Sequence, residues 1–245
     1  MKTLERFQAV LLIAGIGFFL VSFIGMGVAP WTTLKDLRPP EGFSPLNAQE
    51  QRGREIFIRE ACWHCHTQFV RPVANEELRY GPVSEASEYL YEIPQLFGTR
   101  RVGPDLAREA GKRPDDWHLA HLYNPRYTVP WSVMPGFPWL FEKKDGKIVP
   151  TEDAKALVAY LQSLGRLKLP VMQAHEASFR KSFRPGSPPL ETEAMVRRGK
   201  QLFLRECSGC HGVKGDGFTP TQQFLSPPAQ DLSTVRPTAE YVFEL

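Results

Sequence analysis

The sequence predicts a mostly α-helical protein, with a single transmembrane helix at its N-terminus followed by two small domains. Three observations predict this architecture. Residues 9–29 form an apolar run without a charge. The pattern C-x-x-C-H occurs twice, at 62–66 and at 207–211. Apolar residues outside the run recur mainly at helical spacing, and alternation of period two is weak, so any strands should be few and short.

Composition and charge narrow the class of protein. A chain of 245 residues is long enough for one or two compact domains with cores of their own. A net charge of +3 is too small to indicate a nucleic-acid-binding protein. All four cysteines belong to the two C-x-x-C-H patterns, so we expect them to serve those motifs.

The apolar run is long enough to cross a membrane. Its 21 residues would span ~31 Å as a helix, about the thickness of one hydrocarbon core. A cleaved signal peptide is the alternative, but its apolar region would be shorter, and Pro30 follows the best cleavage site. Lys2 and Arg6 precede the run, so we expect a cytoplasmic N-terminus and periplasmic domains at a bacterial inner membrane.

The rest of the chain divides into linkers and domains by composition. After a cytoplasmic tip and anchor at 1–29, we expect a proline-rich linker at 30–45, a first domain at 46–166, a second linker at 167–190 and a second domain at 191–245. Asn47 can cap a helix, with Glu50 three residues on. The expected helices are 47–61, 116–123, 152–164 and 191–206. The first and last of these lead directly into the two motifs.

The two motifs have the spacing of covalent attachment sites for c-type haem. Two thiols three residues apart can form thioethers with the porphyrin, and the adjacent histidine then takes one axial position on the iron. A zinc site is a poor alternative, because ligands this close in sequence cannot close a tetrahedron. A redox disulfide is also poor, since nothing indicates a βαβ setting. The expected haem-binding residues are Cys62, Cys65 and His66 in the first motif and Cys207, Cys210 and His211 in the second.

The second axial ligand of the first haem should be Met134. Of the five methionines, Met134 alone lies in an irregular, proline-flanked loop after the first motif and before the helix that closes the domain. Histidine–methionine ligation would leave no open site for a small molecule. No methionine, histidine or cysteine follows His211. We therefore expect the sequence to stop within the second domain, the alternatives being a ligand from elsewhere or a five-coordinate iron.

Several neighbours of the first haem can be assigned candidate roles. His118 and His121 share a helix face, and we expect hydrogen bonding near the haem or in the core, with ligation as the alternative. The carbonyl of Pro104 should fix the ring of His66, and residues 227–232 should support His211 in the same way. His64 should be exposed. The candidates for pairing with haem propionates are Arg71, Arg100 and above all Arg101.

Residues 1–165 resemble subunit II of the cbb3-type cytochrome c oxidases, the membrane-anchored cytochrome c subunit. The resemblance rests on CWHCHTQFVRP, RYGPVSEASEYLYEIPQLFGTRRVGPDLAREAGK, DDWHLAHLYNPR and VPWSVMPGFPWL. It implies a helix packed on a haem-copper catalytic subunit, a haem held by His66 and Met134, and electron transfer toward the site of oxygen reduction. The second haem domain departs from this pattern and resembles the small cytochrome c domains of the oxidase's other cytochrome subunit, which indicates a fusion.

The expected protein is therefore mostly α-helical, with one transmembrane helix and two cytochrome c-type domains, the second incomplete. Its expected function is to carry electrons through two covalently attached haem c groups to the catalytic subunit, without catalysis of its own. Expected partners are that subunit, other cytochrome subunits, the membrane, and a donor such as a small cytochrome c or a quinol-oxidising complex. The alternatives are the cytochrome subunit of a nitric oxide reductase, a two-haem cytochrome c peroxidase and a free-standing anchored electron shuttle.

Overall fold

The computed structural model describes residues 2–182 and 191–235. The chain forms two compact units, Met1–Phe43 and Ser44–Leu245. The second unit holds both C-x-x-C-H motifs, so the two motifs belong to one packed body.

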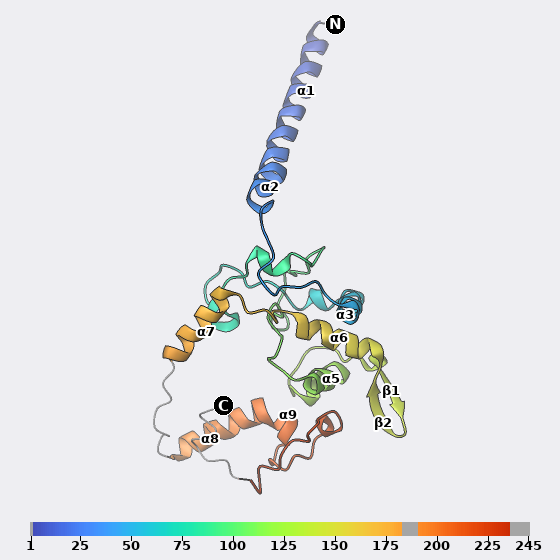
Figure 1. The fold of residues 1–245 in the computed structure, drawn as a ribbon, viewed down its shortest axis with the longest axis vertical. Helices are drawn as coiled ribbons and strands as arrows, with labels where there is room; N and C mark the ends of the chain where they lie inside the picture. Colours follow the sequence, from blue (N-terminus) through green and yellow to red (C-terminus); the bar gives the residue numbers. More distant parts are fainter. Residues whose placement is uncertain (1, 183–190, 236–245) are drawn as a thin grey trace. The chain divides into compact units, whose positions relative to one another are not determined.

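Residues 2–34 of the first unit form a continuous helix. It consists of α1 (Lys2–Phe23), a π-helical turn (Ile24–Val28) and α2 (Ala29–Leu34) (Figure 1). Among the described residues, one helix, Glu5–Leu34, is long and apolar enough to cross a membrane. The predicted end of the helix at residue 29 is wrong, because α2 continues past Pro30 into the expected linker. Proline removes one helical hydrogen bond, and the π turn before it shifts the pattern so that the Ala29 amide donates to the Ile24 carbonyl.

The second unit is organised around two crossed helices, α3 (Ala48–Arg59) and α6 (Glu152–Ser163). A reciprocal capping box of Asn47 and Glu50 starts α3, as predicted. Gly53 lies at the crossing, where an added Cβ would be 1.9 Å from the carbonyl oxygen of Ala156. The rings of Phe57 and Tyr160 meet edge to face at 5.4 Å and fill the core beside this contact.

Shorter elements connect the crossed helices. They are α4 (Glu76–Tyr80), α5 (Asp115–Tyr123) and an antiparallel hairpin of β1 (Phe141–Lys144) and β2 (Lys147–Pro150). Single 3₁₀ turns lie at Cys62–His64, Ala86–Tyr89, Pro125–Tyr127, Pro138–Leu140 and Pro220–Gln223. Within the described ranges the strands are therefore few and short, as predicted.

The segment expected to be a linker at 167–190 contains a helix. α7 (Pro170–Ser182) begins in it, and Leu169 and Met172 are buried, so the start of this segment is anchored by apolar packing. The prolines and glycines of this stretch favoured a linker, whereas the apolar side chains of Leu169 and Met172 between them pack in the core. The residues from 183 to 190 lie outside the described part.

The second motif is reached through α8 (Glu193–Leu202), a π turn (Phe203–Cys207) and α9 (Ser208–His211). The predicted helix 191–206 is thus present, with its last turn widened. The pattern Gly-x-x-x-Phe occurs before both motifs, as Gly53 to Phe57 and as Gly199 to Phe203. Unlike Gly53, Gly199 has nothing within 4 Å of the position that an added Cβ would take.

Candidate haem-binding sites

The first motif follows directly on α3. Ala61 adopts the left-handed conformation (φ 57°) and ends the helix, and the 3₁₀ turn Cys62–His64 then brings the two cysteines together. All four thiols of the chain are free. His64 is exposed, as predicted. The segment after the motif therefore starts from a fixed point at the end of a buried helix.

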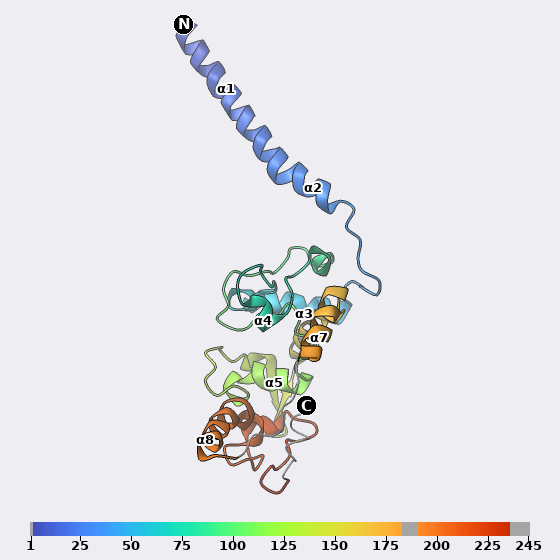
Figure 2. The same ribbon diagram turned by 90° about the vertical axis from the view of Figure 1, so that its left-hand side faces the viewer.

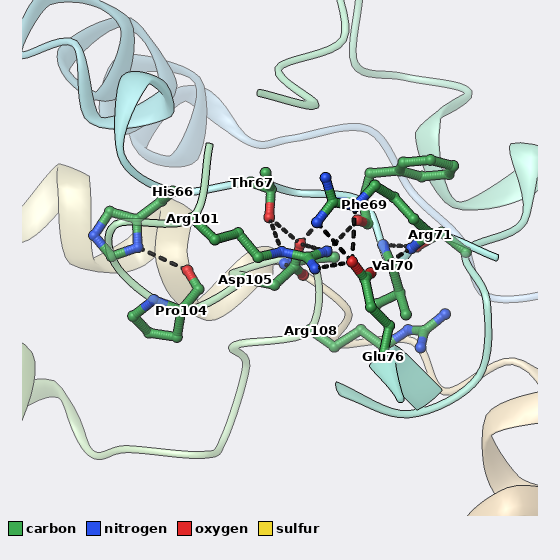
Figure 3. Close-up of polar contacts among 12 residues, drawn as sticks. His66, Thr67, Phe69, Val70, Arg71, Glu76, Arg101, Pro104, Asp105 and Arg108 are labelled. Carbon is green, nitrogen blue, oxygen red and sulfur yellow. Dashed lines mark hydrogen bonds and ion pairs between the residues drawn. The ribbon is translucent and has the colours of Figure 1, made fainter. Parts of the chain in front are cut away.

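The His66 ring is held by a backbone carbonyl. Its Nδ1 lies 2.8 Å from the Pro104 oxygen, which confirms the contact predicted from sequence (Figure 3). Because a carbonyl can only accept, Nδ1 carries the proton and the lone pair is on Nε2. Burial lowers the pKa of His66, which favours the neutral ring that a metal ligand requires.

Backbone hydrogen bonds keep Pro104 in this position. The amide of Gly103 donates to the Cys65 carbonyl at 3.0 Å, and the amide of Leu106 donates to the Thr67 carbonyl at 2.8 Å. Gly103 passes so close to the imidazole that an added Cβ would lie 2.2 Å from Cε1 of His66. A side chain at this position would push the ring away from the carbonyl.

The second motif repeats the same arrangement. Nδ1 of His211 lies 2.9 Å from the carbonyl oxygen of Gln230, within the segment predicted to support it. The amide of Leu232 donates to the Gly215 carbonyl at 2.7 Å and ties that segment to the loop after the motif. In both copies, a carbonyl far along the chain fixes the tautomer of the histidine that ends the motif.

Met134 lies where the sequence placed it, in the irregular loop between α5 and α6. It is half-buried and packs against the core cluster, and its amide donates to Ser132 Oγ at 3.2 Å. His121 lies on α5, with Nδ1 2.7 Å from Thr128 Oγ1. Burial lowers the pKa values of His118 and His121 to about 4, so both rings are neutral at neutral pH. Ligation by Met134 stays a prediction.

The donor set fits covalent haem at both motifs. Each site offers two free thiols and one imidazole whose Nδ1 is already bonded, which leaves Nε2 for iron. Within the described ranges, no group of three or more histidine, cysteine, aspartate or glutamate side chains is placed to share a metal ion.

Comparison with known families decides the affiliation. Residues 1–151 match the model of the cytochrome c oxidase mono-haem subunit, FixO. The chain belongs to the FixO family. Residues 196–241 match the cytochrome c family. These residues lie outside the match to the mono-haem subunit. No curated protein matches the chain.

Membership of the FixO family indicates the general function of the chain. The chain is a cytochrome subunit of a cbb3-type oxidase, and its two family matches imply covalently bound haem c and partner oxidase subunits. This agrees with the resemblance seen in the sequence over 1–165 and with the contact between His66 and the Pro104 carbonyl.

Arg101 lies in a buried network next to the first site of this FixO chain (Figure 3). Its guanidinium pairs with Glu76, lies 3.2 Å from Asp105 Oδ2, and donates to the Phe69 carbonyl at 2.7 Å. Nε donates to Thr67 Oγ1 at 2.5 Å. Arg71 pairs with Glu76 as well, and Arg100 is exposed. Pairing of Arg101 with a haem propionate stays a prediction. In the structure the Arg101 side chain is the cation of a network with Glu76 and Asp105.

The carboxylates of this network were not predicted from the sequence. Asp105 follows Pro104 directly, and its carboxylate accepts from Thr67 Oγ1 at 2.6 Å and from the Phe69 amide at 3.0 Å. The network therefore ties the chain just after His66 to the segment that supplies the Pro104 carbonyl. Asp105 could have been predicted as part of the site, because it directly follows Pro104 in the sequence. No local sequence pattern links Glu76 to Arg101.

The stability of this FixO chain should depend on pH through Glu76. Hydrogen bonds from Arg101, and then from Arg71, lower the pKa of Glu76 from 4.5 to about 2. Because the folded pKa is the lower one, the contribution of this carboxylate to stability is present above pH 4.5 and is lost as pH falls toward 2. Denaturant unfolding of the full chain in detergent should show Glu76→Gln to be less stable at neutral pH, with the difference narrowing below pH 4.5.

The exposed neighbour Glu77 supplies the control for this prediction. Glu77→Gln should match the parent protein across the same pH range, because no buried cation depends on it. A difference between Glu76→Gln and the parent that stays constant down to pH 3 would contradict the assignment.

Proposed function

We propose that the chain is a membrane-anchored dihaem electron-transfer subunit, with one haem c at each motif, that passes electrons to the haem-copper catalytic subunit of a cbb3-type oxidase. The observation that carries this proposal is the repeated geometry of His66 with Pro104 and His211 with Gln230. Two motifs with the same histidine support argue for two working haem sites, one more than the mono-haem family model describes.

The roles of the residues follow from their chemistry. Haem bound at each motif supplies a reversible one-electron change, with no bond made or broken. Cys62 and Cys65 hold the first group through thioethers, and His66 offers Nε2 to the iron. Met134 would offer its thioether sulfur as a further ligand of the same iron. At the second site Cys207, Cys210 and His211 have the same roles, and a sixth ligand is not assigned.

The helix Glu5–Leu34 supports a single-pass anchor. Lys2 and Arg6 lie before the apolar run, which favours a cytoplasmic N-terminus and periplasmic haem domains. Electrons would come from a periplasmic donor, such as a small cytochrome c or a quinol-oxidising complex, and leave toward the catalytic subunit. We infer that the second domain is the entry site, because the first belongs to the oxidase family.

The proposal is tested on the complex that co-purifies with the tagged chain from detergent-solubilised membranes. We expect a large haem-copper partner, rapid cyanide-sensitive oxygen uptake with a reduced donor, and two haem c groups per chain by mass spectrometry of the haem-bearing chain. Nitric oxide consumption without oxygen uptake would point to a nitric oxide reductase. A chain that purifies alone, takes up no oxygen and reduces peroxide would overturn the proposal.

Replacing Met134 should change the first haem selectively. In Met134→Ala, loss of the thioether should lower the reduction potential of the first haem by on the order of 0.1 V and open the iron to carbon monoxide. Redox titration and carbon monoxide difference spectra measure both effects. Met195→Ala serves as the control, because Met195 is 40% exposed on α8 and precedes the other motif. Equal behaviour of the two variants would exclude Met134 as the ligand.

A further inference from the structure

The second motif makes a backbone contact with the first domain. Gly209 lies between Cys207 and Cys210 and is buried. A Cβ added to Gly209 would lie 2.5 Å from the carbonyl oxygen of Thr128 and 2.9 Å from that of Tyr127. Real Cβ atoms do not approach an oxygen this closely, so only glycine permits the contact.

A threonine of the second domain closes the same contact. Thr221 is fully buried, and its Oγ1 lies 2.7 Å from the Tyr127 carbonyl and 2.7 Å from the Gly209 carbonyl. One hydroxyl therefore bridges a carbonyl of the first domain and a carbonyl inside the second haem motif. A buried hydroxyl without such partners would be costly.

Two further contacts hold the second domain against α5 and β1, as Figures 1 and 2 show for α5. The ring of Phe224 lies 5.5 Å from the ring of Tyr123 and 6.0 Å from that of Phe141, and it packs against the core of the first domain. The amide of Ser226 donates to Asp116 Oδ2 at 3.0 Å. The packing of Phe224 and the hydrogen bond of Ser226 thus add to the Gly209 contact between the two domains.

Thr128 connects this contact to the first haem site. Its Oγ1 lies 2.7 Å from His121 Nδ1, while its carbonyl faces Gly209. Cys62 of the first motif and Phe224 of the second domain pack against the same core cluster. Thr128 also precedes Met134 by six residues in the same loop. Thr128 therefore links the Gly209 contact to α5 and to the loop that carries Met134.

We propose that Tyr127, Thr128, Gly209 and Thr221 form an intramolecular docking seam that holds the two haem motifs in a fixed mutual position, so that electrons pass between them within one chain. This rests on the dihaem function proposed above. Each transfer oxidises one site by one electron and reduces the other by one, with no proton or bond change. The seam is a property of this two-motif chain, since Gly209 and Thr221 lie outside the match to the mono-haem model.

The first motif provides the substitution that tests the seam. His64 occupies the position in Cys62–Cys65 that Gly209 occupies in Cys207–Cys210, and it is exposed. A histidine at this position is therefore compatible with a C-x-x-C-H motif. Gly209→His should leave haem attachment intact and disturb the contact with Tyr127 and Thr128. His64→Gly is the matched control, because it makes the reciprocal change at an exposed place.

The measurement is amide hydrogen exchange of the full chain in detergent, with haem attachment checked by mass. In the parent and in His64→Gly, we expect protection at the amides of 126–128 and 208–211. In Gly209→His, we expect loss of that protection while both haems remain attached. Phe224→Ala is the second variant, because it weakens the seam from outside the motif and should cause the same loss.

Redox titration gives an independent measurement. In the parent chain, reduction of one haem should shift the potential of the other, and this shift should vanish in Gly209→His. Unchanged protection and an unchanged shift in both Gly209→His and Phe224→Ala would overturn the seam. Oxygen uptake by the purified complex tests the oxidase role separately, so the failure of either proposal can be recognised without the other.

Discussion

Gly53→Ala should destabilise the first domain by about 3 kcal/mol, the upper part of the range for overpacking a tight core. The added methyl group would lie 1.9 Å from the carbonyl oxygen of Ala156 and 2.7 Å from Cβ of Tyr160. Neither atom is the end of a flexible side chain, so α3 and α6 must move apart. Denaturant unfolding followed by circular dichroism, with hydrogen exchange on α3 and α6, measures the effect.

The chain carries its own control for this prediction. Gly199 occupies the equivalent position on α8, and nothing lies within 4 Å of its Cβ site. Gly199→Ala should therefore be neutral or stabilise α8 by up to ~1 kcal/mol, because alanine restricts the unfolded chain and favours the helix. Equal destabilisation by the two substitutions would show that the crossing of α3 with α6 is not the cause.

This pair of glycines illustrates what the sequence could and could not predict. The sequence predicted a helix before each motif, and the structure confirms both as α3 and α8. The pattern Gly-x-x-x-Phe occurs before both motifs. The same pattern could not distinguish a glycine pressed against a neighbouring helix from one with open space around it. That difference depends on α6, which lies about a hundred residues further along the chain from Gly53.

Local chemistry accounts for the predictions that the structure confirms. The capping box at Asn47, the helix at 152–164 and the carbonyl support of His66 all follow from short sequence patterns. The two errors came from proline. Pro30 continues a helix because a π turn precedes it, and Pro170 begins α7, since the first turn of a helix tolerates proline.

The buried network around Arg101 could not be predicted from the sequence. Arg101 was singled out for its charge as a partner for a haem propionate, whereas its contacts in the structure include carboxylates on two segments far apart in sequence. Charge alone does not tell whether an arginine faces a cofactor or a buried carboxylate. The distinction can be made by substitution, because the two roles predict different effects on stability.

Arg101→Met should destabilise the chain by about 3–5 kcal/mol, because it removes the cation and leaves buried carboxylates behind. Asp105 would keep its hydrogen bonds from Thr67 and Phe69 but lose its charged partner, and Glu76 would retain only Arg71. Arg101→Lys should rescue little, since an ammonium group cannot reach Glu76, Asp105 and the Phe69 carbonyl together as the guanidinium does. Denaturant unfolding at neutral pH measures these losses.

Arg100→Met is the matched control, because Arg100 is the exposed neighbour and its loss should change stability by less than ~0.5 kcal/mol. The positioning role of Arg101 has its own signature. With the network broken, the segment that carries Pro104 loses its hold on the His66 ring, so the potential of the first haem should shift while that of the second stays constant. A shift without loss of stability would favour direct pairing with a propionate. Loss of stability together with the shift would assign Arg101 to the support of His66.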